Sequence, residues 1–317
     1  MGTILDRSAG IFPPIRRLIA SRDAALAERD EAFAARDVAD AATLRRVLGV
    51  ASPDTYLRAS LNGSPLWLPR DTLLTMTHCA HWNTDGGLCL WVEFAHLAWM
   101  AERLAAGGTF LDVGASTGAT TLPIAVSGGV TIVAYEPAAV ARELLVATLA
   151  RNGIGGVCIR PIAVSDAHGV TEFREYEPDE TGQTPWQPEA SSLAAPSMSP
   201  APHRTYPVPV VTLDDDILPH CTKPVVIKID VEGFEVHVVR GAQRLIECHR
   251  PYLSIDIHND PFGDGSTTTE AGIVALLPDY CCERLGHVLV CTPLAIPPEE
   301  CVRSAPPLPG MVIRPTK

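Results

Sequence analysis

The chain has 317 residues, of which 46% are hydrophobic and 20% are charged, so it is long enough to bury a substantial core. Its 25 basic and 37 acidic side chains give a net charge of −12, which repels phosphate backbones and argues against a nucleic-acid partner. It contains no apolar run of roughly 20 residues, so we expect no membrane span. The nine cysteines are scattered without a CxxC pair, which excludes a zinc framework and a disulfide scaffold. The scattered cysteines, together with an N-terminus that lacks the pattern of a signal peptide, favour a cytoplasmic enzyme with reduced thiols.

Residues 1–106 are predicted to form a helical and irregular appendage. Residues 17–48 should be helical, and Ile19, Leu26 and Phe33 lie seven residues apart within them. This spacing suits a short coiled coil, through which the chain would form a homo-oligomer, but Asp40 stands where the next apolar residue is due. We favour a single amphipathic helix and keep oligomerisation as the alternative. The proline-rich residues 52–87 are expected to be irregular, and 88–106 to be mainly helical.

Short apolar strands and helices alternate from Thr109 onward, which predicts an α/β domain over residues 107–317 with a parallel sheet covered on both faces. The expected strands lie at 109–113, 130–135, 157–164, 225–231 and 252–258, and the helices at 119–126, 138–151 and 234–249. An extra strand at 169–175 precedes a loop insertion at about 177–207, which is either a lid or a disordered insert. The tail should contain a helix near 269–277 and strands near 281–285, 288–291 and 311–314.

The turn after the first of these strands, FLDVGASTG at Phe110–Gly118, is the most informative segment. Glycines in such a turn let a ligand approach bare backbone, and parallel sheets bind ligands at the carboxyl ends of their strands. A dinucleotide site needs G-x-G-x-x-G, but Ser116 and Ala119 replace the second and third glycines.

The same turn also spells G-x-S-x-G, the nucleophile elbow of serine hydrolases, with Ser116 as nucleophile and His258 or His287 downstream. A hydrolase needs several strands before its elbow, whereas irregular chain and helices are expected here. This alternative therefore depends mainly on the spelling of the motif.

S-adenosylmethionine is the third candidate ligand and the one that we favour. Asp112 would orient the amino-acid end of this cofactor. The residues of the turn that would wrap around it are Gly114, Ala115, Ser116 and Gly118. The next strand ends at Glu136, whose two carboxylate oxygens match the two hydroxyls of a ribose. A solvated acid at a strand end is the simpler alternative for Glu136.

Several motifs recur in order between residues 110 and 258. The most specific are KIDVEGFE at Lys228–Glu235 and the Gly241-Ala242 pair that follows. Shorter motifs lie at Tyr135–Pro137, Ile162–Asp166, Ser191–Leu193 and Thr212–Asp215. Together these motifs resemble those of the FkbM-type methyltransferase family.

The resemblance implies a class I methyltransferase fold, which is a Rossmann-like α/β domain, here with an N-terminal helical appendage. It also implies S-adenosylmethionine as cofactor, adds Ala163 to the cofactor-binding residues, and points to O-methylation of a sugar or another small-molecule hydroxyl. The chain departs from the family at Ser116, which replaces the usual asparagine, and at Asp256, which replaces the glutamate of a Glu-x-His motif.

Methyl transfer to a hydroxyl needs alignment of the reactants and a base that takes the proton. Strand alternation should place Lys228, Asp230 and Glu232 on one side of a strand end. We expect Asp230 near the cofactor and acceptor, and Glu232 either binding the acceptor or supporting Asp230. Lys228 would hold both acids ionised and oriented; a purely structural ion cluster is the alternative. His258 is expected to be the base because histidine titrates near neutrality. Asp230, Glu232 and His258 could also hold a divalent cation. A non-catalytic assembly protein with this fold remains a further hypothesis.

Overall fold

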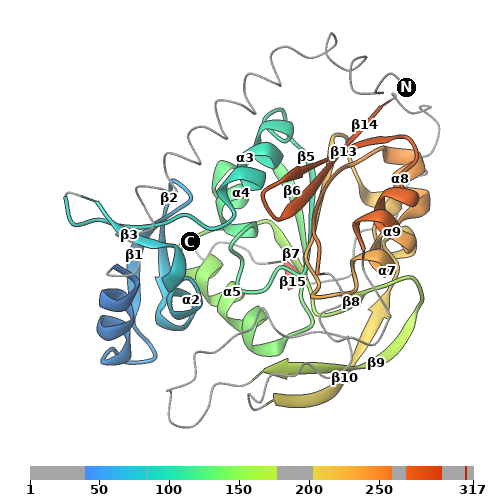
Figure 1. Cartoon of the computed structure of the whole chain (residues 1–317). Coiled ribbons are helices and arrows are strands. Elements are labelled where there is room, and N and C mark those ends of the chain that lie inside the picture. The colour runs from blue at the N-terminus through green and yellow to red at the C-terminus, as the bar shows by residue number, and fades with distance from the viewer. Residues whose placement is uncertain (1–39, 84, 177–202, 259–268, 295–310, 313–317) are drawn as a thin grey trace.

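The computed structural model describes residues 40–83, 85–176, 203–258 and 269–294, together with the backbone of 311–312. An eight-stranded sheet forms its centre (Figure 1), in the order β13-β14-β12-β11-β5-β6-β7-β15. Its five parallel strands are β5 (Gly108–Val113), β6 (Val130–Tyr135), β7 (Val157–Arg160), β11 (Val225–Ile229) and β12 (Tyr252–Asp256). Strand β14 (Val288–Pro293) runs antiparallel to β12 and to β13 (Tyr280–Leu285), and β15 (Met311–Val312) antiparallel to β7. The predicted Rossmann-like fold with a mostly parallel sheet is confirmed.

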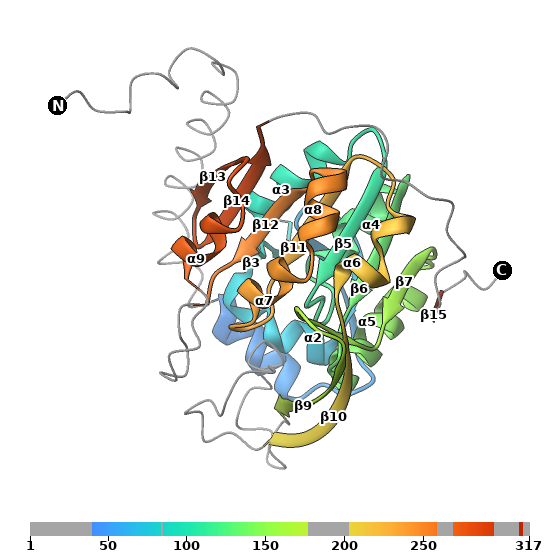
Figure 2. The same ribbon diagram turned by 90° about the vertical axis from the view of Figure 1, so that its right-hand side faces the viewer.

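Helices cover both faces of this sheet because alternate residues of each central strand point to opposite sides. Leu111 and Val113 pack in one apolar cluster with the helices α6 (Leu213–Asp216), α7 (Glu235–Arg240), α8 (Gln243–His249) and α9 (Glu270–Ala275). Figure 2 shows α6, α7 and α8 on the near face of the sheet. Phe110 packs on the other face with α3 (Phe94–Arg103), α4 (Thr121–Ser127) and α5 (Ala139–Arg151).

The chain before β5 forms a small second sheet in the order β2-β1-β4-β3. Its strands are β1 (Tyr56–Leu61), β2 (Ser64–Pro69), β3 (Ala80–Trp82) and β4 (Leu88–Leu90), with α2 (Arg70–Thr75) and the 3-10 helix η2 (Thr77–Cys79) between β2 and β3. The prediction of irregular chain over 52–87 is therefore wrong. The hairpin turns at Asn62-Gly63, and both residues have positive φ angles, 48° and 87°, as a tight hairpin turn requires.

The appendage shares a hydrophobic core with the central sheet. Leu44 and Leu61 are fully buried in the same apolar cluster as Phe110 of β5 and Val226 of β11. Residues 40–49 are helical, as expected, whereas 17–39 lie outside the described residues. The side chain of Asn62 accepts a hydrogen bond from the backbone N–H of Val92 and donates one to its carbonyl, which holds the chain just before α3 against the β1–β2 hairpin.

Three predicted segments in the Rossmann-like part differ from the structure by more than two residues. The expected strand 157–164 divides into β7 and β8 (Ala163–Val164), which leaves the central sheet and joins β10 (His203–Val211) and β9 (Gly169–Tyr176). The expected loop 177–207 ends earlier because 203–207 belong to β10, and 177–202 lie outside the described residues.

The expected helix 234–249 divides into α7 and α8 at Gly241. There the backbone passes so close to another segment that a Cβ would lie 2.0 Å from the carbonyl oxygen of Ser165. The predicted helix and strands of the tail are confirmed as α9, β13, β14 and β15.

Candidate active site

The loop after β5 forms a backbone cradle over the ends of two neighbouring strands. The backbone N–H groups of Gly114 and Ala115 both donate to the carbonyl of Tyr135 at the end of β6, at 3.0 and 3.1 Å. On the other side the loop touches the end of β11, where a Cβ on Gly114 would lie 1.8 Å from the carbonyl oxygen of Asp230. Gly114 also has a φ of +81°, so glycine is required for this close passage.

Glu136 lies beneath this cradle and is only 6% exposed. Its Oε2 accepts a hydrogen bond from the backbone N–H of Ser116 at 2.6 Å, and its Oε1 accepts one from Ala138 at 2.7 Å. Burial raises the pKa of Glu136 to about 7, although both backbone N–H groups lower it. A solvated strand-end acid does not describe this residue. Each carboxylate oxygen retains a second lone pair for a further donor.

Lys228 connects the cradle to the strand ends. Its Nζ donates to the carbonyl of Gly114 at 2.8 Å and lies 3.0 Å from Oδ2 of Asp230 and 3.6 Å from Oδ1 of Asp112. The charges of Asp230 and Asp112 raise the pKa of Lys228 against the opposing effect of burial.

Asp112 is fully buried and accepts a hydrogen bond from the hydroxyl of Thr121 at 2.6 Å. Its other oxygen, Oδ1, has no hydrogen-bond partner among the described residues. Burial raises the pKa of Asp112, whereas Lys228 lowers it. Asp112 therefore offers one unused acceptor beneath the loop.

Asp230, Glu232 and His258 lie close together just beyond the ends of β11 and β12. The expected strand 225–231 ends at Ile229 and Glu232 has a φ of +54°, so alternation along a strand does not account for the position of Glu232. Nε2 of His258 lies 3.5 Å from Oε2 of Glu232 and 3.9 Å from Oδ1 of Asp230. Burial raises the pKa of Asp230, and burial together with the charge of Asp230 raises the pKa of Glu232 to about 8.

Glu235 also belongs to the site, although it was not among the residues predicted from the sequence. Its side chain is fully buried, and its Oε1 lies 2.9 Å from Nδ1 of His258 and accepts the backbone N–H of Gly233 at 3.0 Å. Burial lowers the pKa of His258, but the hydrogen bond to Glu235 and the nearby charges outweigh it and raise this pKa to about 10. The expectation that His258 titrates near neutrality is therefore wrong. Its place at the end of the KIDVEGFE motif, the most specific motif of the chain, is the sequence feature that could have marked Glu235 as a site residue.

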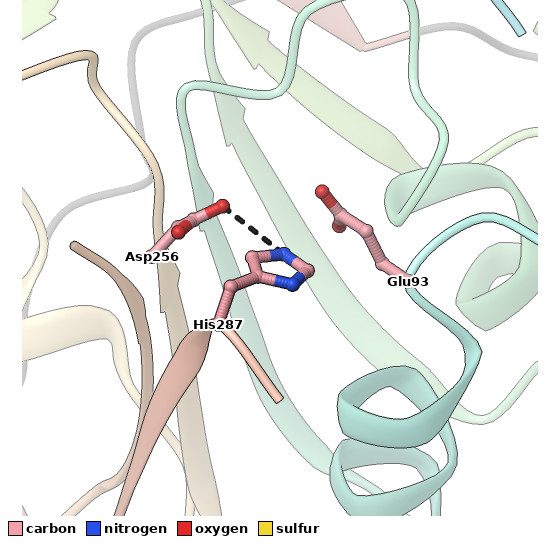
Figure 3. Close-up of side chains that lie close together, drawn as sticks. All are labelled: Glu93, Asp256 and His287. Atoms are coloured by element: carbon pink, nitrogen blue, oxygen red, sulfur yellow. Dashed lines mark ion pairs between the residues drawn. The ribbon is translucent and has the colours of Figure 1, made fainter. Parts of the chain in front are cut away.

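Two groups of three side chains in the described part of the chain bring possible metal-ligand atoms within 4.8 Å of one another. One group is Asp230, Asp256 and His258. It differs from the set predicted from the sequence in having Asp256 in place of Glu232. The other is Glu93, Asp256 and His287 (Figure 3), of which neither Glu93 nor His287 was proposed as a metal ligand.

Ser116 and Ala163, which the sequence predicted as cofactor-binding residues, belong to neither of these two groups. The backbone N–H of Ser116, not its hydroxyl, is bonded to Glu136, and Ser116 has a φ of +48°. Within the described residues, His258 and His287 are paired with carboxylates and not with Ser116, so no hydrolase triad forms there. Ala163 is buried in β8 and packs in a separate apolar cluster with Ala138 at the start of α5.

Comparison with known proteins gives one family. The family model described as Methyltransferase FkbM domain matches residues 112–289. No curated protein matches the chain. Among the described residues, no helix combines the length and apolar character needed to cross a bilayer.

Solved structures similar to this chain include the methyltransferase FkbM from Methylobacillus flagellatus KT, with 20% identity, a TM-score of 0.39, and coverage of 59% of this chain and 44% of that one. A 16S rRNA N2 methyltransferase from T. thermophilus shows 16% identity and a TM-score of 0.36, covering 76% and 50%. A precorrin-6y methyltransferase from Geobacter metallireducens GS-15 shows 11% identity and a TM-score of 0.32, covering 62% and 84%. The chain spans half or less of the length of the first two.

Proposed function

Because the chain belongs to the FkbM methyltransferase family, we propose that it transfers a methyl group from S-adenosylmethionine to a hydroxyl of a sugar or another small-molecule acceptor. The observation that carries the cofactor part is Glu136, a buried carboxylate whose two oxygens keep lone pairs beside a glycine cradle.

The residues around the cradle fit this cofactor. Glu136 would accept hydrogen bonds from both ribose hydroxyls, because a carboxylate matches a vicinal diol. Oδ1 of Asp112, which accepts no hydrogen bond from the described residues, would accept one from the ammonium of the amino-acid end, directly or through water. The turn residues that would wrap around the cofactor are Gly114, Ala115, Ser116 and Gly118. When bound, the cofactor supplies a methyl group already activated on a positively charged sulfur.

The acceptor hydroxyl would lie on the side of Asp230 and His258. Glu235 holds Nδ1 of His258, so Nε2 faces the site and can accept the hydroxyl proton when the imidazole is neutral. Asp230 and Glu232 would bind further hydroxyls of the acceptor. Lys228 keeps Asp230 oriented and ties it to the cofactor loop through Gly114.

The charge of this side of the site favours a neutral acceptor. Asp230 and Asp256 lie beside His258, and Glu235 lies directly behind it, so three carboxylates surround one imidazole. A carboxylate or phosphate on the acceptor would be repelled by these groups, whereas hydroxyls can donate to them. Polyhydroxylated molecules such as sugars are the acceptors that this arrangement suits best.

Cofactor binding is tested by calorimetry with S-adenosylhomocysteine on the wild type, Glu136→Ala and the control Glu143→Ala, whose exposed side chain lies on α5. We expect micromolar-range binding that Glu136→Ala weakens by about 10- to 100-fold, because charged hydrogen bonds contribute about 1.5–3 kcal/mol. The control should bind like the wild type. Absence of binding in the wild type would refute the proposal.

Catalysis is tested with S-adenosylmethionine labelled on the methyl group and a panel of sugars and glycosides. We expect Asp230→Asn to bind S-adenosylhomocysteine but to lose most of the transfer. An Asp230→Asn variant as active as the wild type would remove Asp230 from the mechanism, and no transfer to any member of the panel would favour the assembly-protein hypothesis.

A further inference from the structure

A second group of side chains meets beside the proposed acceptor position (Figure 3). Glu93 comes from the appendage immediately before α3, Asp256 from the end of β12, and His287 from the turn between β13 and β14. One oxygen or nitrogen of each lies within 4.8 Å of the others, and Oδ2 of Asp256 is 3.3 Å from Nε2 of His287. Three segments that are distant in the sequence thus place two carboxylates around one imidazole.

We propose that Glu93, Asp256 and His287 bind a divalent cation. Two carboxylate oxygens and one imidazole nitrogen suit ions such as Mn²⁺, which accept both hard oxygen and nitrogen ligands. Three protein ligands leave coordination positions open for water or for hydroxyls of another molecule.

The local charge balance supports a cation at this place. Asp256 lies within 4.8 Å of Glu93 on one side and of Asp230 on the other, so three carboxylates gather around this place. Lys228 is already shared between Asp230, Asp112 and the Gly114 carbonyl. A divalent ion between Glu93 and Asp256 would offset this excess of negative charge.

The ligands are also held in place from behind. Oε2 of Glu93 lies 3.0 Å from Nε2 of His96, a side chain in α3 that is 3% exposed. This contact leaves Oε1 of Glu93 available for an ion. Metal-binding carboxylates are commonly fixed by such outer hydrogen bonds.

The position of the ion also suggests what it does. Asp256 belongs both to this group and to the group that contains His258. An ion held by Asp256 would therefore lie next to the proposed base, where it would bind and acidify an acceptor hydroxyl. This role rests on the proposed methyl transfer, whereas the binding of the ion does not.

The test uses the full chain, Mn²⁺ as the probe, and electron paramagnetic resonance to count free and bound ion. We expect one bound ion, with affinity lowered at least about tenfold in Glu93→Gln and in His287→Gln, since each loses one ligand. Glu102→Gln is the matched control, because Glu102 lies on the same helix with its side chain 63% exposed. Pulsed measurements on the wild type should show ¹⁴N coupling from an imidazole, and His287→Gln should lose it.

Two results would overturn the cation site. One is no Mn²⁺ binding by the wild type at millimolar concentration. The other is binding that Glu93→Gln and His287→Gln leave unchanged, with the nitrogen coupling retained, which would place the ion elsewhere. Calorimetry with S-adenosylhomocysteine on each variant shows that it is folded and tests the cofactor proposal separately, because neither Glu93 nor His287 belongs to the cradle.

Discussion

The carboxylate of Glu235 lies 2.9 Å from Nδ1 of His258, and this carboxylate has no exposure to solvent. Nε2 of the same ring lies near Glu232 and Asp230, at 3.5 and 3.9 Å. A buried acid on one side of the imidazole therefore fixes which nitrogen faces the site and how strongly the ring holds its second proton.

Replacing Glu235 with glutamine removes the largest of the interactions that raise the pKa of His258. We expect this pKa to fall from about 10 toward the ordinary value of about 6.5. Because only neutral His258 can accept a proton, transfer by the wild type should increase as the pH rises toward 10, and Glu235→Gln should reach its plateau at lower pH. Nuclear magnetic resonance titration of the imidazole and a pH–rate profile measure the two effects.

The same substitution should change the pH dependence of stability. Because the pKa of His258 is higher in the folded chain than in the unfolded chain, its protonation stabilises the folded state. This contribution is complete below about pH 6.5 and is lost as the pH rises through about 10. The difference in the free energy of unfolding between the wild type and Glu235→Gln should therefore be larger at pH 6 than at pH 10.5. If His258 titrates identically in both proteins, Glu235 does not control it.

The pKa of Glu136, about 7, predicts how cofactor affinity depends on pH. The ribose hydroxyls donate to the ionised carboxylate, so binding below pH 7 first requires loss of a proton. Affinity for S-adenosylhomocysteine should fall by about tenfold per pH unit well below 7 and level off above it. Glu136→Gln should bind more weakly with no such slope. Calorimetry between pH 5.5 and 8.5 measures both curves, and a slope that persists in Glu136→Gln would assign the proton to another group.

The cradle, which we propose to bind the cofactor, could be located from the sequence because its information is local. An apolar strand, a glycine turn and an acid at the end of the next strand define Gly114 and Glu136 within one βα unit, and parallel strands bring their carboxyl ends to one edge. The same logic placed Lys228 and Asp230 on one side of β11.

The acceptor side was only partly predictable because it depends on tertiary packing. Glu93 reaches the site only because the small sheet of the appendage packs on the α3 face, and His287 only because the β13–β14 hairpin returns beside β12. The prolines of residues 52–87 led to the prediction of irregular chain. The Asn62-Gly63 pair in the same segment is typical of a β-hairpin turn and could have indicated the β1–β2 hairpin. The pKa of His258 could not be inferred either, since it depends on the burial of Glu235.

Gly114→Ala should disrupt the cradle through a steric clash as well as through backbone strain. A positive φ costs alanine about 1–2 kcal/mol, and the added Cβ would meet the Asp230 carbonyl at 1.8 Å. Gly153→Ala is the control, because Gly153, just after α5, has a φ of +64° with no atom within 4 Å of the added Cβ. Thermal unfolding should show a larger loss for Gly114→Ala than for Gly153→Ala, and only Gly114→Ala should lose cofactor binding. Equal losses would mean that the close passage over β11 is unimportant.

Ser116→Ala separates methyl transfer from hydrolysis. Glu136 is bonded to the backbone N–H of Ser116, which alanine retains, and alanine tolerates the φ of +48° about as well as serine does. We therefore expect Ser116→Ala to bind S-adenosylhomocysteine within about fivefold of the wild type, since the loss of one neutral hydroxyl contact costs about 0.5–1 kcal/mol. Fluorophosphonates should label neither protein, because a serine reacts with them only when a base activates its hydroxyl and none is hydrogen-bonded to Ser116 in the described part of the chain. Labelling of the wild type that disappears in Ser116→Ala would show an activated serine, and the turn after β5 would then be a nucleophile elbow.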